Sequence, residues 1–376
     1  MKSVLIFSGN NDRAIIAFCR YAMLNNISFS IVTNGGNDLI FNTAFKRNVI
    51  CTREFNKLSI ENILFYVENI RKNSGVDTVF ILPSTEYLNR FLINHKTALE
   101  QNNIDTGLCG KKLYELISDK YSFSEKCKDF KIDVPKEFDE FPKAYPYIIK
   151  PKLYKTTESK IDKPTIITSK KDLKKYWKDK DLKDYYLQEY VEGKSIYLLY
   201  YFSKDGNYDV FSQENLIQQY NGGSMVLCKS SNYHLETISE KFGELFTSLN
   251  FSGLVMVEVK LHNNKFVMIE ANPRLWGPSQ LILDAEMNLF DSFALDNELL
   301  KNVKKRNYKK DVWYFWSGGI VDTLYNKQEL TYYNFKKKYF ITNYQEILKN
   351  EIFLKPDTLN IYLKQNKLNE QEREIN

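Results

Sequence analysis

Residues 266–277, FVMIEANPRLWG, begin as a buried strand and end in side chains suited to chemistry. Glu270 and Asn272 follow the apolar residues at alternate positions, so they share one face of the strand, and Arg274 lies just beyond. Carboxylate and amide oxygens are the ligands that Mg²⁺ prefers, usually together with substrate phosphates. A guanidinium binds a phosphate or an acyl phosphate through two parallel hydrogen bonds. The segment therefore predicts a metal and phosphate site at the end of a strand.

A second strand, residues 254–261, precedes this segment and is joined to it by the polar residues HNNK, which are typical of a hairpin. We expect a three-residue loop at 263–265, with Val259 opposite Ile269. Alternation then places a set of apolar residues on the core face: Val255, Val257, Val259, Leu261, Val267, Ile269 and Ala271.

In this register Glu258 lies directly opposite Glu270. Two carboxylates that face each other across a hairpin destabilise it unless a cation lies between them. A solvated hairpin face is the plain alternative for a lone pair of glutamates. The combination with Asn272, Pro273 and Arg274 favours a cation site instead.

Composition narrows the class of protein. The chain has 376 residues, 43% hydrophobic and 27% charged, which suits two or three globular domains rather than a disordered chain. No apolar run approaches the roughly 18 residues that a membrane span requires, so no membrane partner is expected. Residues 1–13 suit a first β-strand better than a signal peptide.

Cysteine usage points to a cytoplasmic protein, and charge usage bears on whether it binds nucleic acid. The five cysteines are scattered and never form a CxxC pair, which favours a reducing compartment and argues against a zinc site or disulfide framework. The net charge of +6 is mild, and lysines are mixed with acids throughout, so we expect no nucleic-acid partner.

The first 110 or so residues alternate strands with helices, which predicts βαβ units and a parallel, doubly wound sheet. GNNDRA does not match the dinucleotide fingerprint GxGxxG. Later segments mix both kinds of element. The expected strands are 3–8, 27–34, 47–52, 77–85, 145–151, 184–193, 254–261 and 266–271, and the expected helices are 12–26, 61–73, 86–95, 111–132, 170–181 and 234–250.

Taken together, VEVK (257–260) and IEANPRLWG (269–277) resemble the metal-binding hairpin of the ATP-grasp superfamily, which includes D-alanine–D-alanine ligase, biotin carboxylase and the carbamoyl phosphate synthetase large subunit. The resemblance reaches to about residue 300 and is closest to carboxylate–amine ligase-like members. It implies an α/β and α+β architecture, with an N-terminal Rossmann-like domain before the ATP-grasp fold. The implied units are 1–111, a small lobe 112–190, a large lobe 191–300 and a C-terminal extension 301–376.

The resemblance also implies a set of site residues. Glu258, Glu270 and Asn272 would hold Mg²⁺, or alternatively Mn²⁺, bridging the phosphates of ATP, while Arg274 would contact phosphate or the reacting acyl group. The segment 118–136 supplies Lys120, and YPYIIKP supplies Lys150, both for the phosphates. LQEYVEG (187–193) supplies the adenine edge and a ribose ligand; these residues are Gln188, Glu189, Tyr190, Val191 and, for the ribose, Glu192.

Two departures from the family pattern stand out. Residues 152–164 contain no glycine, where many members have a glycine-rich loop over the phosphates, so hydroxyls of Thr156, Thr157 and Ser159 are expected to replace its backbone donors. Ser195 stands where the family usually has its ribose glutamate. Substrate-lining candidates are Asn10, Glu86 and Trp276.

The resemblance implies an ATP-dependent ligase that needs no protein nucleophile. A substrate carboxylate attacks the γ-phosphate to give an acyl phosphate, and an amine then displaces phosphate, with positioning and charge neutralisation supplied by the protein. A bicarbonate-activating enzyme of the same fold and a non-catalytic ATP-binding module are the alternatives. Small-molecule carboxylates and amines are the expected partners, with a homodimer as in many relatives.

Overall fold

The N-terminal sheet is built around β1 (Ser3–Phe7), whose five residues are all buried. The computed structural model describes residues 2–53, 58–157, 160–178 and 180–365. Five parallel strands take the order β3-β2-β1-β4-β5, which confirms the predicted parallel sheet. The other strands are β2 (Phe29–Asn34), β3 (Val49–Arg53), β4 (Val79–Ile81) and β5 (Ile104–Asp105).

Helices cover both faces of this sheet because successive residues of β1 point to opposite sides. Val4 and Ile6 pack on the side of α1, whereas Leu5 and Phe7 pack on the side of α2 and α3. Side-chain caps begin two of these helices: the Ser59 hydroxyl accepts from the backbone of α2, and that of Thr85 from α3. The helices are α1 (Asp12–Leu24), α2 (Ile60–Ser74), α3 (Glu86–Asn94) and α4 (Lys96–Gln101), with 3₁₀ turns η1 (Leu39–Asn42) and η2 (Ala44–Asn48).

The stretch 111–132, predicted to be helical, forms two helices rather than one, because it breaks at Asp119. The backbone of Asp119 is extended, and its carboxylate accepts a hydrogen bond of 2.6 Å from Arg90. Two helices result, α5 (Lys111–Ser118) and α6 (Lys120–Asp129). The break makes Lys120 the first residue of α6.

A small antiparallel sheet follows, in the order β6-β9-β7-β8, around a core that includes Tyr147, Ile149 and Leu187. Its strands are β6 (Glu137–Phe138), β7 (Tyr147–Pro151), β8 (Thr165–Ile167) and β9 (Tyr185–Glu189), and its helix is α7 (Lys170–Tyr176). On β7 and β9, Lys150 pairs with Tyr186 and Ile148 with Gln188. Alternation therefore places Lys150 and Gln188 on the face opposite this core.

The large sheet carries the motif from which the site was predicted. Its strand order is β14-β13-β10-β11-β12-β15, and β16 pairs with β11. A hairpin at Asp205-Gly206 joins β10 to β11. The strands are β10 (Lys194–Phe202), β11 (Tyr208–Gln218), β12 (Met225–Ser231), β13 (Gly253–His262), β14 (Lys265–Asn272), β15 (Trp313–Phe315) and β16 (Thr331–Tyr332).

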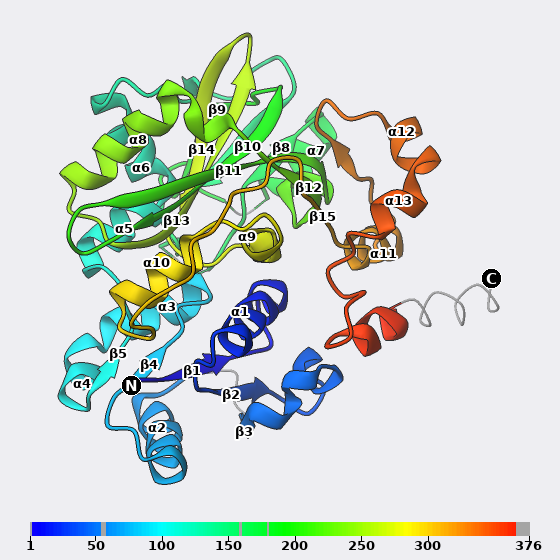
Figure 1. Cartoon of the computed structure of the whole chain (residues 1–376). Coiled ribbons are helices and arrows are strands. Elements are labelled where there is room, and N and C mark those ends of the chain that lie inside the picture. The colour runs from blue at the N-terminus through cyan, green and yellow to red at the C-terminus, as the bar shows by residue number, and fades with distance from the viewer. Residues whose placement is uncertain (1, 54–57, 158–159, 179, 366–376) are drawn as a thin grey trace.

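One face of the large sheet packs against α8 and the other faces the N-terminal sheet. Phe242 and Phe246 of α8 share a core with Val255 and Val257, whereas Met256 shares a core with α1 and α10. Figure 1 shows the blue N-terminal elements below this green and yellow sheet. The helices and 3₁₀ turns are α8 (Thr237–Ser248), α9 (Gln280–Asp284), α10 (Leu289–Asp296), α11 (Gly318–Tyr325), α12 (Lys337–Thr342), α13 (Tyr344–Leu348), η3 (Tyr220–Gly222), η4 (Tyr233–Leu235) and η5 (Gly277–Ser279).

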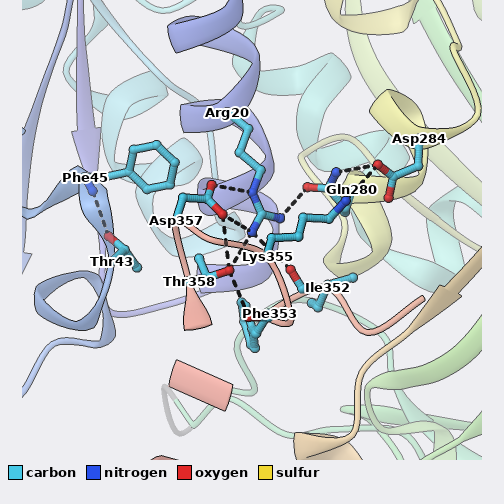
Figure 2. Close-up of polar contacts among 10 residues, drawn as sticks. All are labelled: Arg20, Thr43, Phe45, Gln280, Asp284, Ile352, Phe353, Lys355, Asp357 and Thr358. Carbon is cyan, nitrogen blue, oxygen red and sulfur yellow. Dashed lines mark hydrogen bonds and ion pairs between the residues drawn. The ribbon is translucent and has the colours of Figure 1, made fainter. Parts of the chain in front are cut away.

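The C-terminal segment returns to the N-terminal helices after adding β15 and β16 to the large sheet (Figure 1). The buried guanidinium of Arg20, on α1, holds it there. Arg20 Nε donates to Asp357 Oδ2 at 2.7 Å, and its Nη2 donates to Thr358 Oγ1 at 2.7 Å. Figure 2 shows these bonds together with the 2.7 Å bond from Arg20 to Gln280 of α9. A single side chain thus joins three distant parts of the chain.

None of the helices in the described ranges combines the length and the apolar character that crossing a bilayer would require.

Candidate active site

The hairpin that carries the predicted metal ligands closes by a two-residue turn rather than the expected three-residue loop. His262 pairs with Lys265, and the two residues between them, Asn263 and Asn264, both have positive φ, at 47° and 60°. Tight hairpin turns need positive φ at both central positions, and asparagine tolerates it. The predicted pairing of Val259 with Ile269 is therefore wrong, and Val259 pairs with Met268.

A β-bulge then restores the predicted pairing of the two acids. Val259 pairs with Met268 and Glu258 with Glu270, which leaves Ile269 without a partner in the ladder. The bulge also changes which residues face the core: Met268 is fully buried there, in place of the expected Val267 and Ile269. Glu258 and Glu270 lie directly opposite each other, as predicted.

The Glu270 carboxylate is held by two neighbours. The ammonium of Lys120, at the start of α6, forms an ion pair with Glu270 Oε2, and Asn272 Nδ2 donates to Oε1 at 2.8 Å. Burial by itself would raise the pKa of Glu270, but the Lys120 charge and these hydrogen bonds together lower it to about 2. The side chain therefore stays ionised, as a metal ligand must be.

Two further cations lie beside this carboxylate. Arg274 Nη2 donates to Asn272 Oδ1 at 3.1 Å. Lys150 Nζ, from β7 of the small sheet, donates at 3.1 Å to the carbonyl of Ile269, the residue that the bulge leaves unpaired. Burial, and then the nearby charge of Lys120, lowers the pKa of Lys150 to about 8. The structure thus brings together all the residues predicted for the metal and phosphates.

Glu258 is oriented by a chain of buried polar groups that runs across three strands. Gln213 Nε2 donates to Asn215 Oδ1 at 2.7 Å, Asn215 Nδ2 donates to Ser195 Oγ at 2.9 Å, and Ser195 Oγ donates to Glu258 Oε1 at 2.9 Å. Burial raises the pKa of Glu258; Lys260 opposes this effect and the Glu270 charge adds to it. The carboxylate therefore has a fixed position, and its Oε1 lies 3.8 Å from Lys260 Nζ.

The strand expected to edge the adenine ends at Glu189, whose backbone N–H donates to the carbonyl of Lys136, just before β6. Tyr190 and Val191 follow this strand, and Glu192 is exposed. Gln188 is fully buried, yet its Nε2 and Oε1 both lack partners among the described residues. A buried donor and acceptor left free on the same face as Lys150 suit a ligand that offers one of each.

The glycine-free segment after β7 folds back on itself. Thr156 bonds to Lys160 through its backbone, and Thr157 Oγ1 donates to Asp184 at 2.7 Å; Ser159 lies outside the described residues. Of the substrate-lining candidates, Glu86 pairs with Arg90 at 3.1 Å and Trp276 is buried.

Two carboxylates and one amide are the protein oxygens available for a cation. Within the described part of the chain, no three His, Cys, Asp or Glu side chains gather into a metal site. Mg²⁺ typically binds through one or two carboxylates and completes its coordination with substrate phosphates and water. The donor set of Glu258, Glu270 and Asn272 therefore fits a metal that arrives with phosphates, beside the lysines that would bind those phosphates.

Residues 117–278 match the family model described as an ATP-grasp domain. This part of the chain is an ATP-grasp domain. The match spans α6, the small sheet and the large-sheet hairpin, so all the residues predicted for the metal and the nucleotide lie within the ATP-grasp domain. No curated protein matches the sequence.

Solved ATP-grasp structures show the same fold at low sequence identity. Biotin carboxylase from Campylobacter jejuni, in a β,γ-ATP complex, has a TM-score of 0.58 at 15% identity, covering 83% of this chain and 74% of that one. The biotin carboxylase domain dimer of Hydrogenobacter thermophilus 2-oxoglutarate carboxylase, with MgADP and bicarbonate, has a TM-score of 0.59 at 13% identity, covering 83% and 73%. L-amino acid ligase from Bacillus licheniformis has a TM-score of 0.55 at 14% identity, covering 82% and 75%.

Two residues near Glu258 were not predicted from the sequence, namely Lys260 on the same strand and Tyr333 in the C-terminal segment. Lys260 Nζ lies 3.8 Å from Glu258 Oε1 and 3.6 Å from the ring centroid of Tyr333. Tyr333 follows β16 in the C-terminal segment, and its hydroxyl donates to Gln218 Oε1 at 2.5 Å. The alternation of β13 places Lys260 on the face of Glu258 and so could have identified it, but no local pattern points to Tyr333.

Proposed function

We propose that the protein is an ATP-dependent ligase, which activates a carboxylate as an acyl phosphate for attack by an amine and releases ADP and phosphate. The main support is the pairing of Glu258 with Glu270, because facing carboxylates are stable only with a cation between or beside them. The convergence of Lys120, Lys150 and Arg274 on the same place adds the positive charge that phosphates need.

In this proposal Glu258, Glu270 and Asn272 would hold Mg²⁺, and Mn²⁺ is the alternative. The bound metal supplies charge neutralisation at the phosphates of ATP. Lys120 and Lys150 would bind phosphate oxygens, and Arg274 would bind phosphate or the acyl group. Gln188, Glu189, Tyr190 and Val191 would edge the adenine, with Glu192 at the ribose; the free amide of Gln188 is the observation that supports this placement.

The residues themselves act by positioning and by charge. The carboxylate substrate is the nucleophile in the first step, and the amine is the nucleophile in the second, so no side chain needs to be activated as a nucleophile. Fixed cations such as Lys150 and Arg274 stabilise negative charge that grows in the transition state. Each group of this kind contributes up to several kcal/mol of barrier lowering.

Bicarbonate is the second candidate for the activated carboxylate. The similar structures described above are two biotin carboxylases, one of them with bicarbonate, and an amino acid ligase. Their similarity to this chain concerns the fold alone, so it does not choose between the two reactions. Formation of ADP that depends on bicarbonate and not on an organic acid would select the carboxylase. One of the similar structures, the biotin carboxylase domain of 2-oxoglutarate carboxylase, is a dimer. Because this chain has the same fold, we propose a homodimer for it as well.

The test is a screen for ADP release with amino acids and small carboxylic acids, with and without bicarbonate, using the wild type and Glu270→Gln. We expect activity with at least one acid and amine pair and a loss of at least about 100-fold in Glu270→Gln, with unchanged circular dichroism. Glu346→Gln, which alters an exposed glutamate paired with Lys349, should keep full activity. Wild-type turnover in Glu270→Gln would show that the site assignment is wrong.

A further inference from the structure

A cavity of about 230 Å³ lies at the carboxyl ends of the parallel strands in the N-terminal sheet. In the order β3-β2-β1-β4-β5, β2 and β3 are added on one side of β1, whereas β4 and β5 are added on its other side. The cavity is lined by residues that follow both of these strands, and open α/β sheets bind ligands at this kind of crevice. Its polar lining is Ser8, Asn10, Asn34, Arg53, Ser84 and Thr85, and the rest of its wall is aromatic or aliphatic.

Arg53, the last residue of β3, is the one charged side chain among the described residues that line this cavity. Its Nη2 donates to the carbonyl of Ser8 at 3.1 Å, and its Nε is buried without a partner among the described residues. Asp38, the described acid whose charge acts on Arg53, uses its oxygens for the hydroxyl of Ser8 and for the backbone of Asn34 and Ile40. With respect to the described residues, the guanidinium therefore keeps donors free for an external anion.

A second free polar group lies across the cavity. The hydroxyl of Ser84, after β4, is buried and has no partner in the part of the chain that the structure describes. Native proteins rarely leave a buried polar group unsatisfied, so a free hydroxyl and a free guanidinium nitrogen in one cavity point to a missing ligand. Both groups donate, so that ligand must accept.

The cavity is joined to the proposed ligase site by one side chain. Asn11 Nδ2 donates to the carbonyl of Ser84 at 2.8 Å and to the carbonyl of Leu275 at 3.1 Å. Leu275 directly follows Arg274, so the wall of the cavity is fixed to the loop that carries the proposed acyl-binding arginine. A molecule in the cavity would therefore be held at a constant distance and orientation from that loop.

We propose that this cavity binds the anionic group, a carboxylate or a phosphate, of a small substrate, with Arg53 as its main ligand and Ser84 as a second donor. At about 30 Å³ per water-sized group, the volume suits a molecule of roughly eight non-hydrogen atoms. The aromatic and aliphatic wall would take a short apolar part of the same molecule. That this molecule is a substrate rests on the proposed ligase function; the anion site itself does not.

Calorimetric titration of the full chain with benzoate and, separately, with inorganic phosphate tests the site. We expect at least one probe to bind the wild type saturably, and Arg53→Gln to weaken that binding at least ten-fold. Ser84→Ala should weaken it by a smaller factor. Arg47→Gln is the matched control, because Arg47 is an exposed arginine before the same strand and should leave binding unchanged. Stronger binding of benzoate assigns a carboxylate, and stronger binding of phosphate assigns a phosphorylated molecule.

The proposal is overturned if neither probe binds the wild type, or if Arg53→Gln binds as tightly as the wild type. Titration of each variant with MgATP provides a separate readout, which should change less than two-fold in Arg53→Gln because Arg53 is not among the proposed nucleotide ligands. Binding of MgATP without any anion binding would defeat this inference alone. Arg53-dependent anion binding by a chain that binds no MgATP would defeat the ligase proposal and leave the anion site standing.

Discussion

Ser195 donates a hydrogen bond of 2.9 Å to Glu258 from the neighbouring strand β10, and it receives one of 2.9 Å from Asn215 on β11. The Ser195 hydroxyl therefore connects Asn215 to Glu258 and holds the Glu258 carboxylate in one orientation. Ser195 stands where the resemblance led us to expect a change at the ribose, but in the structure it contacts the proposed metal ligand. Such partners of a ligand fix its rotamer and its basicity.

Ser195→Ala removes the hydrogen bond that orients the Glu258 carboxylate, and it should therefore weaken Mg²⁺ binding. We expect the half-saturating Mg²⁺ concentration for ADP release to rise about ten-fold, the range typical for loss of a partner of a metal ligand. The free energy of unfolding should fall by about 1–3 kcal/mol, because Asn215 loses a buried acceptor.

Ser212→Ala is the control for this variant. Ser212 is a buried serine of the same sheet whose hydroxyl bonds to Ser231 and not to Glu258. It should lose similar stability without a change in Mg²⁺ dependence. An unchanged Mg²⁺ requirement in Ser195→Ala would contradict the role of this hydrogen bond.

Asp12→Asn should stabilise the protein in a pH-dependent way. Burial, with a smaller contribution from the charge of Asp38, raises the pKa of Asp12 from 3.8 to about 6. Because the folded state binds this proton more tightly than the unfolded state, ionisation of Asp12 costs stability above pH 6, and the cost disappears below about pH 4. Asparagine should therefore add about 3 kcal/mol at pH 8 and under about 1 kcal/mol at pH 4.

Urea unfolding of both proteins at the two pH values measures this difference. Asp139→Asn, at an exposed acid, should show no such pH dependence. If Asp12→Asn changes the unfolding free energy equally at pH 4 and pH 8, the burial of an ionised Asp12 is disproved.

Arg20→Met should loosen the C-terminal segment. The guanidinium is 8% exposed and bonds to Asp357, Thr358 and Gln280, so its removal leaves several buried polar groups without a donor (Figure 2). We expect a loss of about 3 kcal/mol or more in unfolding free energy. Earlier cleavage of the C-terminal segment in limited proteolysis should accompany it. Arg47→Met should change neither measurement, and equal stability of Arg20→Met and the wild type would refute the anchoring role.

A double-mutant cycle of Lys260→Met and Tyr333→Leu should show favourable coupling. The ammonium of Lys260 lies 3.6 Å from the centroid of the Tyr333 ring in a buried setting. Desolvated cation–π pairs are worth up to about 2 kcal/mol, whereas exposed pairs are worth about 0.5–1. The pair Lys126 and Phe130, at 5.4 Å at the end of α6, serves as the more exposed comparison. Coupling in the Lys260–Tyr333 cycle no larger than in that pair would contradict the buried contact.

Local pattern was enough to predict much of this protein. Alternation of strands and helices predicted the parallel sheet, because period and polarity depend on near neighbours. The pairing of Glu258 with Glu270 was also predicted, although the turn length and the bulge that produce it were not. A two-residue turn and a bulge at Ile269 replaced the expected loop, and both depend on backbone angles that the residue types allow but do not dictate.

Tertiary structure alone decided which distant charges meet. Lys120 reaches Glu270 across 150 residues, and it does so because the chain breaks at Asp119 and turns α6 toward the hairpin. Tyr333 and Arg53 came to their places in the same way, from segments with no local signal of a site. The sequence by itself determined most of the elements and the resemblance of residues 117–278 to an ATP-grasp domain. The packing of those elements determined the site, since contacts of long sequence separation depend on how whole elements fill space rather than on the order of residues within each one.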